Sequence, residues 1–357
     1  MSLAAAPFHA ALEALRAALS FAAPADAVLS RYFRENPKLG SHDRNFVAEA
    51  VFGVLRHKLT LDRICAPDPT PRRLLLAWLV RGGRNTREFE AIVGREDERA
   101  WLGQVKGFKN DTLALHEQAE LPDWVVSELQ ASGMDDAAIV TLGKSLSQPA
   151  PLDLRVNTIK MKREAVMAEL EASGIAVETT PYSPYGLRAA GKPQVNRSNL
   201  FKEGGFEVQD EGSQLLGLLL APKRGEMVVD FCAGAGGKTL LLGMLMASSG
   251  RLYAFDVSEK RLANLKPRLA RSGLSNVQPQ RIEHENDVRV KRLAGKLDRV
   301  LVDAPCSGLG TLRRNPDLKF RQSAQSVDEL NAKQASILNA AAKLLKVGGR
   351  LVYATCS

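Results

Sequence analysis

The sequence predicts an α/β protein whose last part is a parallel, doubly wound sheet, preceded by a small α/β unit and an N-terminal helical region. Three observations support this fold class. From Val208 onward, short apolar runs alternate with helical segments, which is the rhythm of βαβ units. A glycine-rich turn follows the first of these runs. Residues 8–147, in contrast, place apolar residues at helical spacing and contain few β-branched runs.

The first region, residues 1–147, is expected to be a helical domain. Leu12, Leu15 and Leu19 recur at helical spacing, and proline and glycine punctuate the chain between such sets. The pattern indicates a small helical bundle.

The second region, residues 148–207, is expected to be a small α/β unit. Its pattern predicts a strand at 152–156, a helix at 163–173 closed by Gly174, and a strand at 175–180. Arg155 and Asn157 fall at the end of the first strand. The pattern is equally consistent with a contact to a phosphate or base edge and with a solvated strand edge.

The third region, residues 208–357, carries the parallel sheet. We expect Gly348 and Gly349 to end its last helix before its last strand begins. The predicted strands are 227–231, 251–255, 277–281, 299–302 and 351–354, and the predicted helices are 237–246, 258–271 and 326–345.

Composition places the chain among ordinary globular proteins. Of its 357 residues, 45% are hydrophobic and 25% are charged, which argues against wholesale disorder. The longest apolar run, 74–80, is shorter than the roughly 18 residues of a membrane span, and no basic residue precedes the Ala-rich N-terminus. We therefore expect a cytoplasmic protein without a membrane partner. Its four cysteines include no Cys-x-x-Cys pair, so we expect reduced thiols and no metal site.

The net charge of +9 is unevenly distributed. Residues 1–150 carry 18 Lys and Arg against 19 Asp and Glu, whereas residues 151–357 carry 31 against 21. Clustered cations gain affinity for RNA or DNA by releasing counterions from phosphates. A nucleic-acid partner and simple solubility are both consistent with this excess.

The turn after the first strand of the sheet, 230–239, suits three classes of ligand, because glycines let a backbone approach a ligand and the next helix presents unpaired N–H groups. A dinucleotide is disfavoured by the glycine spacing. A nucleoside triphosphate is a stronger candidate, since 232–239 matches the P-loop except that Cys232 replaces the first glycine. S-adenosylmethionine is the third.

Two acidic residues bear on this choice. Asp256 ends the second strand, twenty residues after Gly236, where a carboxylate can accept both ribose hydroxyls. This favours a nucleoside, although such an Asp can also cap a helix. Asp287, after the third strand, either reaches an adenine edge or lies in a loop.

Two thiols and a carboxylate follow the next strands. Asp303 and Cys306 follow the fourth strand, and Cys356 follows the fifth, so all three are expected near the ligand-binding edge of the sheet. Carbon 5 of cytosine accepts a methyl group only after a nucleophile adds to carbon 6, and a thiolate suits that addition. Asp303 is placed to donate a proton or hydrogen bond at N3, and a second thiol can assist release.

These motifs closely resemble the Nol/Nop/Sun family of RNA cytosine-5 methyltransferases, and within it the RsmB-like type that methylates small-subunit ribosomal RNA. The segments 39–44 and 51–56 resemble a NusB-like RNA-binding helical domain, and 154–157 resembles part of the linking RNA-binding region. The segments that carry the resemblance to the catalytic domain are 209–210, 213–214, 230–239, 303–308, 313–317 and 353–357.

The resemblance implies a set of site residues. Cys356 would attack carbon 6, Cys306 would assist product release, and Asp303 would serve both catalysis and cofactor binding. The residues by themselves leave the two thiols interchangeable, because Pro305-Cys306 also fits the Pro-Cys nucleophile of DNA cytosine-5 methyltransferases. The implied contacts to S-adenosylmethionine are Cys232, Ala233, Gly234, Ala235, Gly236, Gly237, Lys238, Asp256, Asp287 and Asp303.

Two departures from the family pattern are visible. Gly234-Ala235 stands where the family usually has Ala-Pro, so we expect a more flexible loop. The chain also ends at Ser357, whereas family members continue, so we expect the catalytic sheet to lack its C-terminal strands. A P-loop-like ATPase and a non-catalytic RNA-binding assembly factor remain as alternative functions.

Overall fold

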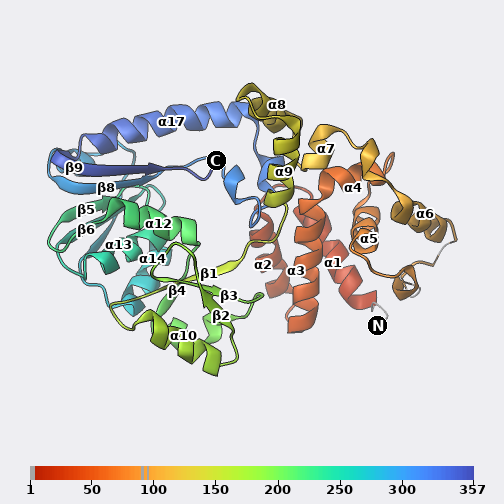
Figure 1. The fold of residues 1–357 in the computed structure, drawn as a ribbon, viewed down its shortest axis with the longest axis horizontal. Helices are drawn as coiled ribbons and strands as arrows, with labels where there is room; N and C mark the ends of the chain where they lie inside the picture. The colour runs from red at the N-terminus through yellow and green to blue at the C-terminus, as the bar shows by residue number, and fades with distance from the viewer. Residues whose placement is uncertain (1–4, 90–91, 95) are drawn as a thin grey trace. The chain divides into compact units, whose positions relative to one another are not determined.

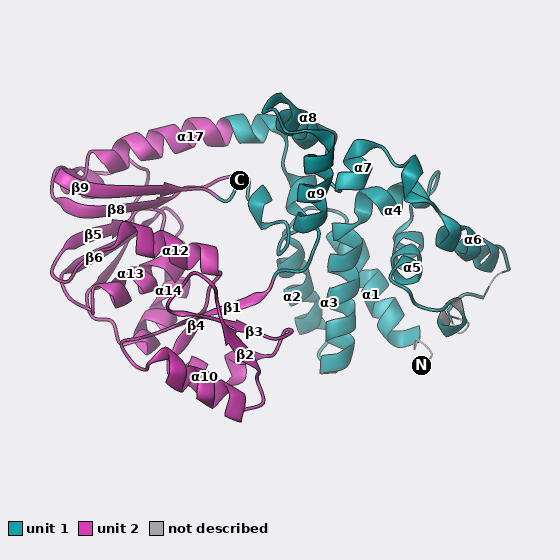
Figure 2. Cartoon of the chain, viewed as in Figure 1, with its two compact units in different colours: residues 1–150, 307–328, 356–357 teal, residues 151–306, 329–355 magenta. Residues whose placement is uncertain are grey.

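The computed structural model describes residues 5–89, 92–94 and 96–357 (Figure 1). Residues 1–4, 90–91 and 95, which belong to the expected helical region, lie outside the described residues. The chain forms two compact units (Figure 2). Unit 1 comprises residues 1–150, 307–328 and 356–357, and unit 2 comprises 151–306 and 329–355.

The N-terminal region is helical, as the sequence predicts. Thr70 begins one helix by accepting a hydrogen bond from the N–H of Arg73, with Pro71 at the first helical position. Phe8, Leu15 and Leu55 are fully buried in the core of the bundle. The helices are α1 (Ala5–Ala18), α2 (Ala25–Glu35), α3 (Ser41–Arg56), α4 (Lys58–Ile64), α5 (Pro71–Arg81), α6 (Glu96–Gly107), α7 (Leu115–Ala119), α8 (Asp123–Ala131) and α9 (Asp136–Leu146), with short 3₁₀ turns η1 (Thr86–Phe89) and η2 (Asn110–Thr112).

A later segment of the chain, residues 307–328, folds into unit 1. It contains the 3₁₀ turn η4 (Leu309–Thr311) and the short helix α16 (Leu318–Arg321). Leu312 is buried in one apolar cluster with Leu121 and Ile139 of the N-terminal region. The helical unit is therefore built from parts of the chain that lie far apart in sequence.

Unit 2 begins with a four-stranded antiparallel sheet in the order β2-β3-β1-β4. The first strand and the helix that follows it agree with the sequence prediction, whereas β3 and β4 were not predicted. The elements are β1 (Leu152–Val156), α10 (Arg163–Ala172), β2 (Val177–Thr179), β3 (Gly186–Ala189), η3 (Val195–Arg197), α11 (Asn199–Lys202) and β4 (Phe206–Val208).

The second sheet of unit 2 has five strands in the order β7-β6-β5-β8-β9, and every pair in it is parallel. The predicted doubly wound α/β fold is confirmed. The order reverses at β5, which starts the sheet in the chain and lies in its middle. The elements are α12 (Glu211–Leu220), β5 (Met227–Asp230), α13 (Gly237–Leu245), β6 (Arg251–Asp256), α14 (Glu259–Ser272), β7 (Val277–Arg281), α15 (Val288–Lys291), β8 (Leu297–Asp303), α17 (Ala324–Ala342) and β9 (Leu345–Ala354).

The end of the last helix differs from the prediction. Helix α17 ends at Ala342, and β9 begins at Leu345, before Gly348 and Gly349 rather than after them. Leu297 of β8 pairs with Leu345, and the next pair after an irregularity is Arg299 with Arg350. The glycines therefore form a bulge within a paired strand, a role that glycine also favours.

Neither interpretation of the polar residues on β1 is correct. Arg155 is 1% exposed and Asn157 is 5% exposed, so neither lies on a solvated edge or faces a nucleic acid. Arg155 donates to the Oε1 atom of Gln209, and Asn157 donates to the carbonyls of Gly204 and Ser272. Their hydrogen bonds join the small sheet to neighbouring parts of unit 2.

None of the helices in the described part of the chain is long and apolar enough to cross a membrane.

Candidate functional site

The loop between β5 and α13 is held by glycine geometry and by one carboxylate. Gly236 has a φ of +80°, and a Cβ there would come within 2.2 Å of Leu265, so both backbone and space require glycine. Asp256, at the end of β6, accepts hydrogen bonds from the N–H groups of Gly234 (2.8 Å) and Ser258 (2.7 Å). Asp256 thus fixes the loop from the end of β6, and both of its carboxylate oxygens accept backbone hydrogen bonds.

A pocket of about 250 Å³ lies beside this loop, within unit 2. Lys238 and Asp303 form an ion pair of 2.6 Å in its wall. Five of the expected site residues therefore share one cavity with residues from β4, α12 and α14. The lining residues are Val208, Gln209, Asp210, Ser213, Asp230, Cys232, Ala233, Gly237, Lys238, Arg268 and Asp303.

Asp230 gives this pocket a buried acceptor without a partner. Its Oδ2 atom accepts a hydrogen bond of 2.7 Å from the hydroxyl of Thr239, whereas no described residue donates to its buried Oδ1 atom. Burial raises the pKa of Asp230 to about 6, and the Thr239 hydrogen bond opposes that increase. An unsatisfied buried carboxylate oxygen beside a cavity suits a ligand that brings a hydrogen-bond donor or a positive charge.

Cys232 also lines the pocket, but it is unsuited to attack. Burial, followed by the neighbouring carboxylates of Asp230, Asp256 and Asp303, raises the pKa of Cys232 to about 12. The thiol therefore stays protonated near neutral pH, and the thiolate is the nucleophilic form. Its position fits a contact to a ligand better than covalent chemistry.

Asp287 lies at a different place from the residues that line the pocket. It begins α15, where its carboxylate accepts hydrogen bonds from the N–H groups of Arg289 (2.8 Å) and Glu283 (3.0 Å). These backbone hydrogen bonds lower the pKa of Asp287. In the structure the residue caps a helix, and 6% of it remains exposed.

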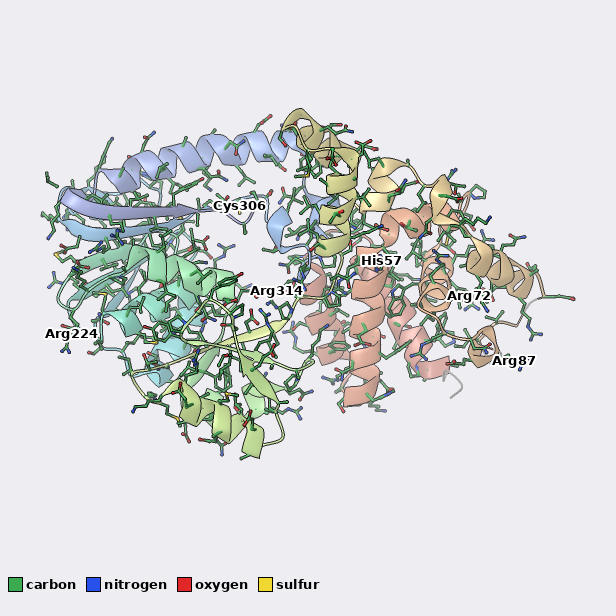
Figure 3. The ribbon with its side chains drawn as sticks, viewed as in Figure 1. His57, Arg72, Arg87, Arg224, Cys306 and Arg314 are labelled. Carbon is green, nitrogen blue, oxygen red and sulfur yellow. The ribbon has the colours of Figure 1, made fainter. Side chains whose placement is uncertain are left out.

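Cys306 follows β8 and is partly buried (Figure 3). The carbonyl of the preceding Pro305 accepts a hydrogen bond of 2.9 Å from Gln334 of α17, and the Oε1 atom of Gln334 accepts one from the Tyr353 hydroxyl. Burial raises the pKa of Tyr353, and so do the nearby Cys306 and Cys232 thiols. Unit 2 therefore brings Cys306 near Tyr353 and supports its backbone.

Cys356 lies in unit 1 and is exposed. Its carbonyl accepts a hydrogen bond of 2.8 Å from the N–H of Gly310, and the hydroxyls of Ser307 and Ser357 are 3.0 Å apart. A Cβ on Gly310 would lie 2.8 Å from the Cys356 carbonyl oxygen. The segment 307–310 therefore determines where the backbone of Cys356 runs.

A buried lysine ties that segment to the N-terminal helices. Lys319 is 3% exposed, and its Nζ atom donates to the carbonyls of Arg56 (2.8 Å) and Glu120 (2.9 Å). It also lies 3.3 Å from the Oε2 atom of Glu120. Asp317 adds a hydrogen bond from the N–H of Ala25. No sequence signal indicated this cluster, because Lys319 and Asp317 lie about two hundred or more residues from their partners.

Arg268 of α14 is a second residue that sequence reasoning missed. It lines the pocket, donates a hydrogen bond of 2.6 Å to the carbonyl of Ala235 and one of 3.0 Å to Glu207. Arg268 and Asp256 thus both hold the glycine loop by hydrogen bonds to its backbone. Arg268 lies within a helix rich in arginine and lysine, so nothing in the pattern distinguished it.

Within the described ranges, no group of three or more His, Cys, Asp and Glu side chains is arranged to hold a metal ion.

Comparisons with known proteins agree with this fold. Residues 217–357 match the family model of the 16S rRNA methyltransferase RsmB/F, and residues 121–196 match that of the ferredoxin-like domain of RsmF/B-like methyltransferases. A probable ribosomal RNA small subunit methyltransferase B from Synechocystis is 32% identical over 368 residues, which cover 93% of this chain and 81% of the relative.

Two solved structures are similar as well. PH0851 superposes with a TM-score of 0.80 at 25% identity and covers 100% of this chain and 87% of its own. A methyltransferase homolog from Pyrococcus horikoshii has a TM-score of 0.56 at 28% identity and covers 66% of this chain and 78% of its own. S-adenosylmethionine is the methyl donor of Rossmann-like RNA methyltransferases of this kind. With the extent and identity of these matches, the chain belongs to the RsmB/F family of 16S rRNA methyltransferases.

Proposed function

We propose that this protein transfers a methyl group from S-adenosylmethionine to carbon 5 of a cytidine in ribosomal RNA through a covalent cysteine adduct. One observation carries the proposal: β8 and β9 are neighbouring parallel strands, and a cysteine follows the carboxyl end of each. Asp303 pairs with Ala354 at the end of the two strands, and Cys306 and Cys356 follow shortly after.

The residues of the pocket fit the cofactor. Asp230 offers an unpartnered buried oxygen to a cationic group, Asp256 lies at the strand end where ribose hydroxyls bind, and the loop 232–238 brings backbone close to the ligand. When bound, S-adenosylmethionine supplies an electrophilic methyl group on its sulfonium. We assign binding to Cys232–Lys238, Asp256 and Asp303, and keep Asp287 as a further candidate because of its place after β7.

The protein would make carbon 5 nucleophilic by a temporary addition. The thiolate of Cys356 forms a bond to carbon 6, and electron density moves toward N3, where Asp303 in its protonated form donates a proton or hydrogen bond. Carbon 5 then takes the methyl group. Loss of the carbon 5 proton restores the double bond as the Cys356–carbon 6 bond breaks, and Cys306 assists this release. Cys356 departs as the thiolate that it was before the addition, and N3 returns its proton to Asp303.

The thiol roles can be tested with RNA in which the target cytidine is replaced by 5-fluorocytidine, since fluorine cannot leave as a proton would. With S-adenosylmethionine present, the unmodified protein should form an adduct that survives denaturing electrophoresis. Cys356→Ala should abolish it. With ordinary RNA, Cys306→Ala should accumulate an adduct that the unmodified protein resolves.

Cys65→Ala is the matched control, because Cys65 is buried among the N-terminal helices and should leave both results unchanged. The reverse pattern for Cys306 and Cys356 would exchange their roles. Adduct formation that survives both substitutions would remove the thiol mechanism.

Ribosomal RNA is the substrate that we infer from the relatives, which are named for ribosomal RNA small subunit methylation. The excess of cations in residues 151–357 supports an RNA partner. We propose that 1–147 and 148–207 serve RNA binding, that 208–357 serves catalysis, and that the reaction takes place in the cytoplasm. Bisulfite sequencing of ribosomal RNA from cells with and without the gene would identify the cytidine.

Titration with S-adenosylmethionine and with Mg-ATP separates this proposal from a P-loop ATPase. Only the first should bind in the pocket beside Asp230. Tight RNA binding without any S-adenosylmethionine binding would instead indicate an assembly factor without turnover.

A further inference from the structure

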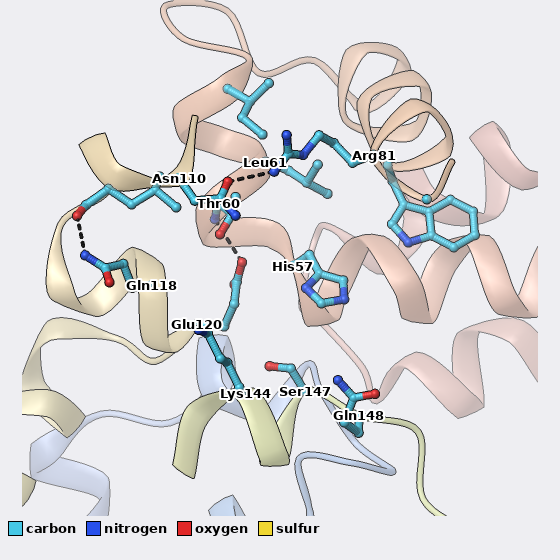
Figure 4. Close-up of a pocket in the computed structure, with 14 residues that line it drawn as sticks. His57, Thr60, Leu61, Arg81, Asn110, Gln118, Glu120, Lys144, Ser147 and Gln148 are labelled. Atoms are coloured by element: carbon cyan, nitrogen blue, oxygen red, sulfur yellow. Dashed lines mark hydrogen bonds between the residues drawn. The ribbon is translucent and has the colours of Figure 1, made fainter. Parts of the chain in front are cut away.

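A second cavity lies within the helical region of unit 1 (Figure 4). Its volume is about 360 Å³, which is within the range of small-molecule sites. Residues from α4, the end of α5, η2, α7 and the end of α9 line it, and none of them lines the cofactor pocket. The catalytic proposal assigns this cavity no task.

The lining has cationic groups and no available carboxylate. Glu120 is its single acid, and its two oxygens already accept hydrogen bonds from the N–H groups of Leu59 (3.1 Å) and Thr60 (3.0 Å) and pair with Lys319. Lys144 makes no ion pair or hydrogen bond with any described residue and is exposed. A cavity with this balance favours an anionic group.

Arg81 supplies a second cation on another wall of the cavity (Figure 4). Its Nη1 atom donates to the carbonyl of Phe108 (2.9 Å), and its Nη2 atom donates to Asn110 (2.6 Å). These two bonds orient the guanidinium, whose five N–H groups exceed the two acceptors. Arg81 is thus a donor held by hydrogen bonds, whereas Lys144 is an exposed cation.

The cavity also has an aromatic and apolar part. Trp78 packs against Gly53, where a Cβ would lie only 2.3 Å from the indole, so the ring is held in place. Leu61 and Ile64, both buried, are apolar residues of the same lining. A fixed indole offers a flat surface on which an aromatic ring can stack.

His57 adds a polar edge between these two parts (Figure 4). Desolvation lowers the pKa of His57, Lys319 and Arg56 lower it further, and Glu120 opposes the shift. The ring is therefore neutral at pH 7, with one donor and one acceptor. No hydrogen bond joins it to another described residue, so both nitrogens are available to a heterocycle.

We infer that this cavity binds a nucleotide, with its base beside Trp78 and His57 and its phosphate on both Arg81 and Lys144. The base would stack on the aromatic part of the lining, and the phosphate would pair with its cations. The same chemistry is presented by a free nucleoside monophosphate and by one nucleotide of an RNA strand. The inference does not depend on the proposed methyl transfer.

The test uses the fluorescence of Trp78. The chain has three tryptophans, so Trp101→Phe with Trp124→Phe leaves Trp78 as the single reporter. CMP and AMP should quench its emission in a saturable way. Cytidine and ribose 5-phosphate, which each lack one half of the ligand, should bind at least about tenfold more weakly.

Lys144→Gln in this background should weaken CMP binding about tenfold and leave cytidine binding unchanged, because it removes one phosphate contact. Lys106→Gln, an exposed lysine of α6 outside the lining, is the matched control and should change neither. Circular dichroism of each variant verifies folding.

Short RNA strands separate the two sources. If an RNA strand displaces CMP and Lys144→Gln weakens its binding, the occupant is a nucleotide of the strand. If CMP binds but RNA does not compete, the occupant is a free nucleotide, and the inference also holds. No quenching by CMP or AMP, equal quenching by ribose 5-phosphate, or indifference to Lys144→Gln would each overturn it. None of these results depends on Cys356.

Discussion

Asp230 illustrates how one buried carboxylate couples the cofactor pocket to stability. Its pKa is raised from 3.8 in a model peptide to about 6 by burial. Between these values the folded protein binds more protons at this site than the unfolded chain, so the free energy of unfolding falls as pH rises. The destabilisation caused by burying the ionised Asp230 is fully present above about pH 6 and absent below pH 3.8.

Asp230→Asn should remove this contribution. From pH 4 to pH 7, the unmodified protein should lose about 2 kcal/mol of unfolding free energy relative to the variant, because one pKa unit corresponds to about 1.4 kcal/mol and the carboxyl of the unfolded chain is already largely ionised at pH 4. Urea unfolding followed by circular dichroism without cofactor, at several pH values, measures the difference. Parallel pH curves for the two proteins would show that Asp230 is not the titrating group.

Lys319 is a buried charge that, unlike Asp230 with its unpartnered oxygen, is fully hydrogen-bonded. Its ammonium has three acceptors inside unit 1. Lys319→Met would leave the carbonyls of Arg56 and Glu120 without this donor and remove the partner of the Glu120 carboxylate. We expect the free energy of unfolding to fall by about 3 kcal/mol. Urea unfolding followed by tryptophan fluorescence reports on unit 1, since Trp78, Trp101 and Trp124 all belong to it.

Lys38→Met, at an exposed lysine of the same unit, is the control and should change stability by less than about 0.5 kcal/mol. Equal stability of the two variants would mean that the buried lysine contributes nothing. The contrast also shows why sequence reasoning placed Asp230 near the site but missed Lys319. A strand followed by glycines is a local pattern, whereas the partners of Lys319 are distant in sequence.

At the scale of elements, the segment around η4 determines the path of the chain at Cys356. Gly310→Ala would place a Cβ 2.8 Å from the Cys356 carbonyl oxygen, a separation that forces backbone to move. Misplacing a reacting group by about 1 Å can cost a hundredfold in rate. We therefore expect adduct formation with 5-fluorocytidine RNA to slow by about ten to a hundredfold, with S-adenosylmethionine affinity unchanged.

Gly103→Ala on α6 is the matched control, because nothing lies within 4 Å of the added Cβ. It should leave the adduct rate as it is. If Gly310→Ala formed adduct at the unmodified rate, the hydrogen bond from Gly310 to Cys356 would have no role in placing the nucleophile. If it also lost cofactor affinity, the damage would extend beyond that loop.

Most strands of the parallel sheet were predictable because each is a short apolar run followed by a turn. The bounds of β7, and of β1 in the antiparallel sheet, match the prediction. The start of β9 was not predictable from the sequence, because two glycines are as common at the end of a helix as in a bulge of a strand. Only the pairing of β9 with β8 distinguishes these roles, and pairing depends on the neighbouring strand. The short strands β3 and β4 similarly depend on β1 for their partners.

At the scale of the molecule, the chain contributes to unit 1 three times, at 1–150, 307–328 and 356–357. The segment 307–328 has a buried lysine, a buried Leu312 and a buried Asp317, and all three make their contacts with the N-terminal helices. Residues 151–357 alone would leave this segment without those partners. The cofactor pocket, in contrast, is lined entirely by unit 2.

A fragment of residues 151–357 should therefore retain S-adenosylmethionine binding but expose the segment to protease. Trypsin should cleave after Lys319 in the fragment within minutes, whereas the full chain, in which Lys319 is 3% exposed, should resist. Arg224, exposed before β5 in unit 2, is the internal control and should be cleaved at the same rate in both (Figure 3). Mass spectrometry of the early products measures both sites. Equal protection of Lys319 in fragment and full chain would mean that the segment folds without the helices, and loss of cofactor binding would mean that unit 2 depends on unit 1.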